Sequence, residues 1–202
     1  MSGRKTTLAS KVCCAALAAL ALAPVVQADA APGAATACIA CHGADGNSVV
    51  PNFPKLAGLQ VEYLSKQLND YITGKRKNEV MAPIIAGLKP RDVPGLASYF
   101  ATQTPAPGKV EDAALAEAGK ALYEDGNIDA GVPACMGCHQ PQGEGNARYP
   151  RLAGQHQAYT LQQMADFKSG ARDNDRGKVM RTVAGRLSEQ EMRAVSEYIA
   201  GL

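Results

Sequence analysis

The chain has 202 residues, 20% of them charged, and a formal net charge of +2 at pH 7. This near-neutral balance is unlike that of a basic nucleic-acid-binding surface, so we expect no nucleic acid among the partners. The length suffices for one medium domain or for two small ones.

The first 30 residues have the order expected of a secretory signal peptide. Basic residues at the start precede an uncharged run from Val12 to Ala23, and small residues then lead to Ala28 and Ala30, after either of which we expect cleavage. The uncharged run is too short to span a bilayer comfortably, which leaves an uncleaved amphipathic anchor as the alternative. We therefore expect a periplasmic protein, with loose membrane association left open.

Removal of this segment changes both the charge and the cysteine count. Cleavage after Ala28 takes away three positive charges, so the formal net charge falls from +2 to −1, and Cys13 and Cys14 leave with it. The mature chain keeps four cysteines in two Cys-x-x-Cys pairs, each followed at once by a histidine. The two segments are Cys38, Cys41 and His42, and Cys135, Cys138 and His139.

A Cys-x-x-Cys-His segment suits covalent attachment of a c-type haem. Each thiol can add to one vinyl group of the porphyrin, and the next residue places its imidazole under the iron. A zinc ribbon needs its two pairs roughly 15 to 20 residues apart, whereas these begin 97 apart. A thioredoxin-type pair belongs beside a βαβ unit and needs no histidine, and two plain disulfides leave both histidines unexplained. We therefore predict two covalently bound haem c groups.

The first half after the haem motif predicts helices. One apolar helix face is formed by Val61, Leu64, Leu68 and Tyr71, and the next by Val93, Leu96 and Phe100. Gly74 can end the first of these helices, and Pro94 is tolerable near the start of the second. Only about eight mature residues precede Cys38, so an opening helix must be short or missing here.

A linker and a second set of helices follow. The stretch TQTPAPGKVED indicates an exposed, fairly stiff linker, which we place at residues 104–112. The predicted helices run from Glu111 to Glu124, through Gln157, Thr160, Met164 and Phe167, and behind the capping box of Ser188 and Glu191 through Met192, Val195 and Ile199. No alternating strand pattern appears anywhere, so the predicted fold class is all-α.

The two halves repeat each other. Cys38 aligns with Cys135 at an offset of 97, and PKLAG from Pro54 aligns with PRLAG from Pro150 at 96. Tyr63, Gln67, Gly74 and Arg76 match Tyr159, Gln163, Gly170 and Arg172 at 96, and Val80, Leu88 and Tyr99 match Val179, Leu187 and Tyr198 at 99. We therefore predict a signal peptide at 1–30 and two domains of one fold at 31–103 and 113–202.

The opposite face of each iron needs a sixth ligand. The chain has three histidines, and His156 aligns with Gln60 or its neighbour, so it is read as a surface or haem-edge group. Met81 and Met180 align with each other, whereas Met164 aligns with Leu68, Met192 with Val93, and Met136 lies between two haem cysteines. We therefore predict His42 and Met81 as ligands of one iron and His139 and Met180 of the other, two packed methionines being the alternative. A thioether favours ferrous iron and raises the reduction potential.

A proline follows each motif at a similar distance. Pro54 lies twelve residues after His42, and Pro150 eleven after His139. Each proline carbonyl could accept a hydrogen bond from the second ring nitrogen of the histidine and so fix its tautomer. A simple loop-shaping role is the alternative.

At these residues the chain resembles the dihaem cytochrome c4 family. The resemblance covers nearly the whole mature sequence through CHGADGN, PNFPKLAG, CHQPQGEGN, YPRLAGQHQAY and the two Val-Met segments. It implies two tandem class I cytochrome c domains related by a pseudo-twofold axis, with haem edges facing across the interface. It also implies a periplasmic carrier of single electrons, typically from the quinol-oxidising complex (quinol–cytochrome c oxidoreductase) toward a terminal oxidase. The short amino terminus of the first domain departs from the family pattern.

The expected protein is a monomeric electron carrier and not an enzyme. A dihaem peroxidase is one alternative, but it needs an iron whose sixth ligand is missing or releasable, and methionines at both aligned positions argue against it. The haem subunit of a dehydrogenase complex, such as a flavocytochrome, is the other alternative, and nothing in the sequence excludes it.

Overall fold

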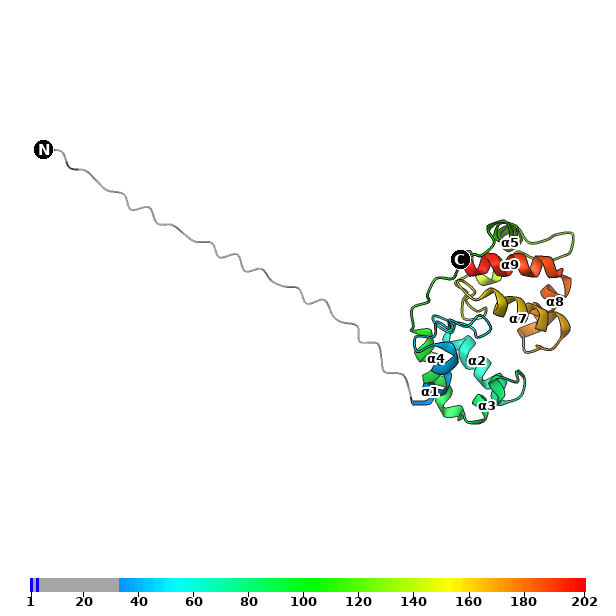
Figure 1. Cartoon of the computed structure of the whole chain (residues 1–202), viewed down its shortest axis with the longest axis horizontal. Coiled ribbons are helices and arrows are strands. Elements are labelled where there is room, and N and C mark those ends of the chain that lie inside the picture. The colour runs from blue at the N-terminus through cyan, green and yellow to red at the C-terminus, as the bar shows by residue number, and fades with distance from the viewer. Residues whose placement is uncertain (2, 4–32) are drawn as a thin grey trace.

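The computed structural model describes Met1, Gly3 and residues 33–202, so almost all of the predicted signal peptide lies outside the described residues. The described chain folds into helices, joined by loops and one isolated antiparallel bridge between Asn127 and Val132 (Figure 1). The predicted all-α class is confirmed. None of the described helices is both long and apolar enough to cross a membrane.

The first domain is small and has a short core. Its elements are η1 (Gly33–Ala35), α1 (Thr36–His42), α2 (Val61–Ile72), α3 (Met81–Ala86), η2 (Pro90–Asp92) and α4 (Val93–Ala101). Leu59 and Leu64 pack with Ala97 and Phe100 of α4, and Cys38 lies against this cluster. Within residues 33–202, only η1 and the first two residues of α1 precede Cys38.

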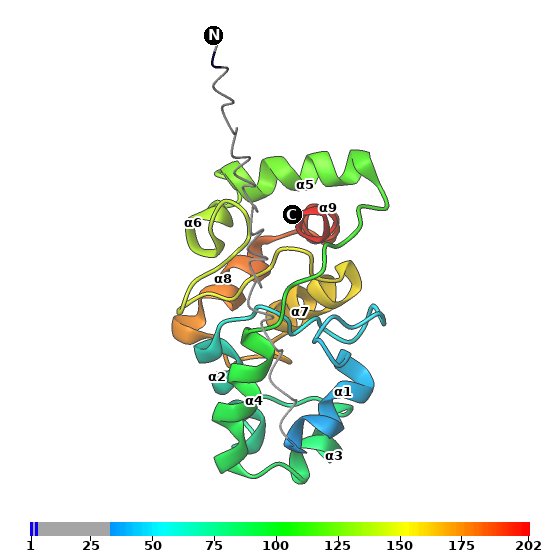
Figure 2. The ribbon, with the colours of Figure 1, turned by 90° about the vertical axis from the view of Figure 1, so that its left-hand side faces the viewer.

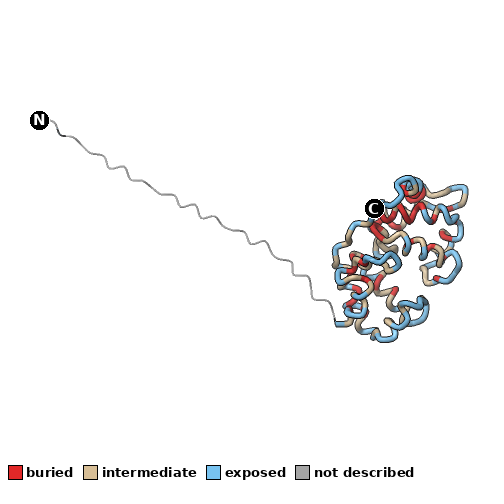
Figure 3. The backbone as a smooth tube through the Cα atoms, viewed as in Figure 1, coloured by how far each residue is buried: buried red, intermediate tan, exposed pale blue. Residues whose placement is uncertain are grey.

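The second domain adds a long helix in front of its haem motif. Its elements are α5 (Ala113–Asp125), α6 (Met136–His139), α7 (Gln157–Ser169), η3 (Arg176–Lys178), α8 (Val179–Arg186) and α9 (Glu189–Gly201). Helix α5 crosses α9 at one end of the molecule (Figures 1 and 2). The core is the cluster of Leu122, Tyr123, Val132, Met164, Leu187, Met192, Val195 and Ile199. Buried positions are accordingly concentrated along α9 and its neighbours, as Figure 3 shows.

Local sequence signals explain where several helices begin and end. The Asp112 side chain caps α5 by accepting a hydrogen bond from Leu115 N, so this helix begins at Ala113 and not at Glu111. Ser188 and Glu191 form the predicted capping box at the start of α9. Gly170 ends α7 in the left-handed conformation, with φ of 81°.

The buried face of α2 differs from the predicted apolar stripe. Leu64 is buried, but Val61 is 41% exposed, and the other buried residues of the helix are Gln67 and Asp70. The reason is tertiary: this face of α2 meets the second domain, where polar side chains bond with residues of that domain. A periodicity count sees only apolar residues and therefore cannot find such a face.

The segment between the domains is held at both ends. Asn47 bonds with Thr104 O and Ala106 N, and Lys55 Nζ donates to the carbonyls of Ala106 and Pro107. At the other end the buried carboxylate of Glu197 accepts from the backbone N–H groups at positions 111 and 112. The linker is thus bonded to both domains and follows a defined path over the surface.

Candidate haem and iron-ligand sites

Helix α1 carries the first haem motif. Cys38 and Cys41 are three residues apart, so they lie on one side of the helix about one turn from each other. Both are free thiols of intermediate exposure, and Cys38 packs against the core of the first domain. His42 ends the helix, is only 6% exposed, and contacts Pro54 O through Nδ1 at 2.8 Å.

The second motif repeats this arrangement. Cys135 precedes α6, and Cys138 and His139 lie within it. Cys135 and Met136 pack against the core of the second domain. His139 is also 6% exposed, and its Nδ1 lies 2.9 Å from Pro150 O. The two sites therefore agree in burial and in hydrogen bonding, and none of their four cysteines forms a disulfide.

The proline carbonyls decide the tautomer of both histidines. A carbonyl oxygen only accepts, so Nδ1 of each ring must be the donor, and the lone pair of a neutral ring is left on Nε2. Burial lowers the pKa of His42 and of His139, against a smaller opposite effect of the proline carbonyls. Both rings are therefore held in the neutral form, with Nε2 available to a metal.

One thiol in each motif has a pKa shifted away from that of a redox-active pair. Burial raises the pKa of Cys38 and raises that of Cys135 to about 11, so both are protonated at neutral pH. A catalytic Cys-x-x-Cys pair needs the opposite shift. Residues 33–202 also contain no group of three or more His, Cys, Asp and Glu side chains that could hold a zinc ion. Each site thus fits a covalently bound haem: two thiols, then an imidazole with a free nitrogen.

The two predicted methionine ligands occupy equivalent places. Met81 is the first residue of α3, Met180 is the second residue of α8, and both have intermediate exposure. Met164 and Met192 are 7% and 2% exposed in the second core, which confirms that they are core side chains. Met136 packs against the same core. The assignment of Met81 and Met180 to the irons stays a prediction.

His156 belongs to the domain interface. Its Nε2 lies 2.8 Å from Ser48 O in the first domain, so this nitrogen donates to the carbonyl. The repeat-related Gln60 makes the reciprocal contact, donating through Nε2 to Glu144 O at 2.7 Å. The repeat pairs His156 with a glutamine and predicts a surface or haem-edge position, but it does not predict the place of His156 between the domains, because a contact between domains leaves no periodic signal.

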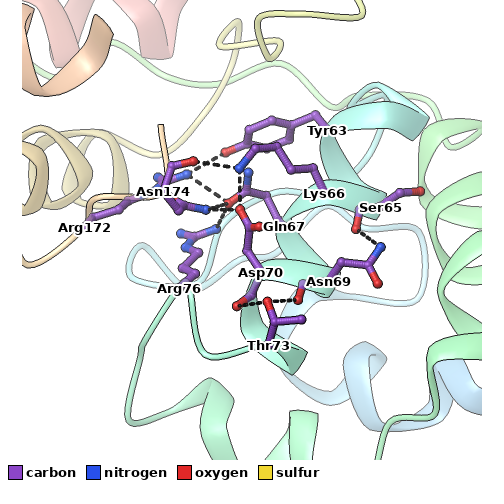
Figure 4. A network of polar contacts seen from close by, with 10 residues as sticks. All are labelled: Tyr63, Ser65, Lys66, Gln67, Asn69, Asp70, Thr73, Arg76, Arg172 and Asn174. Carbon is purple, nitrogen blue, oxygen red and sulfur yellow. Dashed lines mark hydrogen bonds and ion pairs between the residues drawn. The ribbon is translucent and has the colours of Figure 1, made fainter. Parts of the chain in front are cut away.

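The sequence motifs do not predict the polar cluster that joins the two domains. Arg76 donates to Gln67, Tyr159 and Gln163, and Arg172 donates to Gln163, Tyr63 and Gln67, at 2.8–3.1 Å. Figure 4 shows Arg76, Arg172 and Asn174 converging on the side chains of α2. Each arginine therefore bonds with both domains. The repetition of Tyr, Gln and Arg in both halves was a signal that could have identified this surface.

Comparison with known proteins supports the same interpretation. The cytochrome c family model matches residues 30–104 and 116–202. The chain is 46% identical to cytochrome c4 of Azotobacter vinelandii over 188 residues, which is 87% of this chain and 89% of the relative. It is 48% identical to cytochrome c4 of Thiocapsa roseopersicina, over 82% and 86% of the two chains. A thiosulfate dehydrogenase electron acceptor of Thiomonas intermedia is 37% identical over 85% and 81%.

The fold agrees with solved structures. Reduced recombinant cytochrome c4 from Pseudomonas stutzeri superposes with a TM-score of 0.82 at 45% identity, covering 87% of this chain and 98% of that chain. The predictions of two tandem cytochrome c domains and of two covalently bound haem c groups are thereby confirmed. This chain belongs to the cytochrome c4 family of dihaem electron-transfer proteins.

Proposed function

We propose that the chain is a periplasmic carrier that moves single electrons from a quinol-oxidising complex toward a terminal oxidase and makes no chemical bond of its own. The observation that carries the proposal is the equivalence of the two sites. Each has a buried histidine whose Nδ1 contacts a proline carbonyl and a methionine at the start of the equivalent helix, α3 or α8. With these methionines as ligands, both irons would have all their positions filled, and neither haem would offer a place for a substrate.

Each haem would be bound by its own set of residues. Cys38 and Cys41 would hold one haem and Cys135 and Cys138 the other, while the histidine–methionine pairs His42 with Met81 and His139 with Met180 would bind the irons axially. The bound haem supplies a one-electron couple, and thioether ligation raises its potential. The carbonyls of Pro54 and Pro150 orient the imidazoles by accepting from Nδ1.

The periplasmic location rests on the amino-terminal segment. A signal peptide at residues 1–30 would export the chain to the compartment where haem is attached to such motifs and where the proposed donor and acceptor meet it. The proposed partners are quinol–cytochrome c oxidoreductase and a terminal oxidase, met by a monomer that is free or loosely associated with the membrane. Fractionation of cells, with amino-terminal sequencing of the mature protein, would test both export and the cleavage site.

A second function is favoured by some of the relatives. The thiosulfate dehydrogenase electron acceptors of Thiomonas intermedia and Stutzerimonas stutzeri are each 37% identical to this chain. A thiosulfate dehydrogenase (TsdBA) from Marichromatium purpuratum superposes with a TM-score of 0.76 at 36% identity, although this chain covers only 36% of that one. The alternative is therefore that this chain accepts electrons from a dehydrogenase. Co-purification with such an enzyme would favour it over the free respiratory carrier.

Replacement of each methionine tests the carrier proposal directly. Met81→Ala should open only the first haem and Met180→Ala only the second, each gaining carbon monoxide binding and a lower potential at that haem, because the thioether ligand is lost. The unmodified protein should bind carbon monoxide poorly at neutral pH when reduced. When oxidised, it should show the weak red absorption of a sulfur–iron(III) bond. Rapid binding by the unmodified protein at full haem stoichiometry would instead support the dihaem peroxidase alternative.

A further inference from the structure

The two predicted methionine ligands are reached by loops of different length. Arg76 and Arg172 align at an offset of 96, whereas Val80 and Val179 align at 99. The loop before Val179 (residues 173–178) is therefore three residues longer than the loop before Val80 (residues 77–79). Since the rest of the two sites is so similar, the longer loop raises the question of what holds Met180.

In the first domain the contacts that position Met81 come from the loop itself. Asn78 Oδ1 accepts from Met81 N at 3.0 Å, and Asn78 O accepts from Ala82 N at 2.9 Å. Both contacts lie within residues 78–82, at the start of α3. Met81 is thus fixed by its own domain.

In the second domain the equivalent asparagine points to the other domain. Asn174 Nδ2 donates to Asp70 Oδ2 at 2.6 Å and to Gln67 Oε1 at 2.9 Å, while Lys66 Nζ donates to Asn174 O at 2.7 Å. Lys66, Gln67 and Asp70 all lie on α2 of the first domain, as Figure 4 shows. One contact, from Arg172 Nε to Asn174 Oδ1 at 3.0 Å, comes from the second domain itself.

Asp175, the residue after Asn174, connects these contacts to the residue next to Met180. Asp175 accepts from Arg181 N at 3.1 Å and from Arg181 Nε at 2.6 Å, and its side chain is only 5% exposed. Arg181 directly follows Met180 in α8. Between Asp175 and Arg181, Gly177 and Lys178 both have positive φ, of 64° and 60°, so the loop enters α8 through two left-handed residues. A non-glycine residue keeps this conformation only where its surroundings impose it.

We propose that α2 of the first domain positions the methionine of the second domain. In this arrangement, which rests on the proposed ligation by Met180, Lys66, Gln67 and Asp70 are positioning residues that hold Asn174. Asn174 in turn sets the place of Asp175 and Arg181. Met180 is thus positioned by contacts from the first domain, whereas Met81 is positioned by contacts within its own domain. Loosening of the interface should therefore open the second haem and leave the first unchanged.

Asp70→Ala in the mature protein with both haems tests this inference. Asp70 is 8% exposed, so its loss leaves Asn174 Nδ2 and Lys66 Nζ without their shared acceptor. One of the two haems should then bind carbon monoxide about tenfold faster, the effect expected for one lost net hydrogen bond. The half of the red sulfur–iron(III) absorption that belongs to the second haem should also disappear at a lower temperature. Asn174→Ala removes the contact with Asp70 from the loop side, together with the contact with Gln67, and leaves Lys66 bonded to Asp70, so it guards against a general folding defect of Asp70→Ala.

Asp166→Ala is the matched control. Asp166 occupies the repeat position of Asp70, but its carboxylate accepts from Gln162 and Gln163 of its own helix. Carbon monoxide binding and the red absorption should therefore stay as in the unmodified protein. Asp70→Asn keeps an acceptor for Asn174 and should restore slow binding in large part.

Double variants assign the effect to a haem. Asp70→Ala should add nothing to Met180→Ala, while combined with Met81→Ala it should make both haems accessible. Unchanged binding in Asp70→Ala and Asn174→Ala, or an effect on the Met81 site, would overturn the inference. If Met180→Ala itself leaves the spectrum unchanged, the proposed ligation fails; if Met180→Ala opens one haem while Asp70→Ala does not, only the positioning role fails.

Discussion

At the scale of single residues, the contact between each haem-motif histidine and a proline carbonyl defines the site. The spacing from histidine to proline differs by one residue between the two sites, yet the Nδ1 atoms of His42 and His139 reach Pro54 O and Pro150 O at nearly the same distance, 2.8 and 2.9 Å. Because the proline nitrogen carries no hydrogen, the loop contributes an acceptor here without adding a competing donor. The spacing of the two prolines pointed to this contact before the structure was known.

His156 leads to a prediction about pH. Burial lowers the pKa of His156; the Ser48 carbonyl acts against this shift and the Lys55 ammonium acts with it. A pKa below the unfolded value means that the neutral ring stabilises the fold above about pH 6.5 and that this contribution is lost as pH falls through the folded pKa. The midpoint of thermal unfolding should therefore fall between pH 7 and pH 5, and His156→Gln should reduce that fall. Parallel pH profiles for the two proteins would contradict this.

The two core methionines lead to a prediction about stability. Met164 and Met192 are 7% and 2% exposed, so replacement by alanine should cost about 2–5 kcal/mol of unfolding free energy through lost burial and a cavity. Neither change should alter ligation, because both side chains lie in the cluster around Leu122 and Val195. Denaturant unfolding measures the first effect and the red absorption of the oxidised protein the second. Loss of that absorption in either variant would mean that the wrong methionines were assigned to the irons.

At the scale of elements, the crossing of α5 and α9 depends on a glycine. A Cβ at Gly119 would lie 1.9 Å from Ala194 O and 2.4 Å from Ala194 C, so the backbones of the two helices meet at this point. No such helix precedes the haem motif in the described part of the first domain. The second domain therefore gains much of its larger core from one close helix pair.

Gly119→Ala should separate these helices. We expect a loss of about 1–3 kcal/mol in the free energy of unfolding, as for overpacking of a close-packed core. Gly185→Ala in α8 is the control, because a Cβ there meets no atom within 4 Å. That variant should gain about 0.5–1 kcal/mol, since alanine favours a helix over glycine. Equal stability of the two variants in denaturant titrations would show that the crossing tolerates a larger distance.

Sequence patterns predict some of these helices and their buried faces but not others. Helices α7 and α9 and the capping box at Ser188 were predictable because their signals are local. The buried face of α2 was not, since Gln67 and Asp70 are buried by another domain rather than by their own helix. The candidate site shows the same difference. The haem motifs and their prolines are close in sequence and were predictable, whereas the contact between Asp70 of α2 and Asn174 joins residues 104 positions apart.

At the scale of the whole molecule, the interface is a reciprocal set of side-chain contacts with backbone groups. Gln155 accepts from Lys55 N and donates to Lys55 O, and Gln60 accepts from Arg151 N and donates to Glu144 O. Arg76 and Arg172 add bonds from each domain to the other. Such paired polar contacts orient two domains strongly, because each contact leaves a partly buried group unsatisfied if it breaks.

Removal of haem should unfold the protein. The first domain buries only a short set of apolar residues, and a half of this size cannot supply a large core without its macrocycle. A chain in which the four motif cysteines are replaced by serine should therefore show weak helical circular dichroism and no cooperative thermal transition. The protein with both haems, handled identically, is the reference. Native-like helix content in the haem-free chain would contradict this account.

Reduction of the protein should proceed in two one-electron steps with unequal potentials. The halves differ in charge at equivalent positions, as with Lys66 and Gln162, and only the second carries α5 in the described chain. An electron on one haem also makes reduction of the other haem less favourable. Solvent and salt limit this effect, so the separation between the two potentials should narrow as ionic strength rises. Spectroelectrochemical titration measures both steps, and Met180→Ala identifies which step belongs to the second haem by lowering it selectively. A single one-electron wave that accounts for half of the haem would mean that the two sites are not both active in electron transfer.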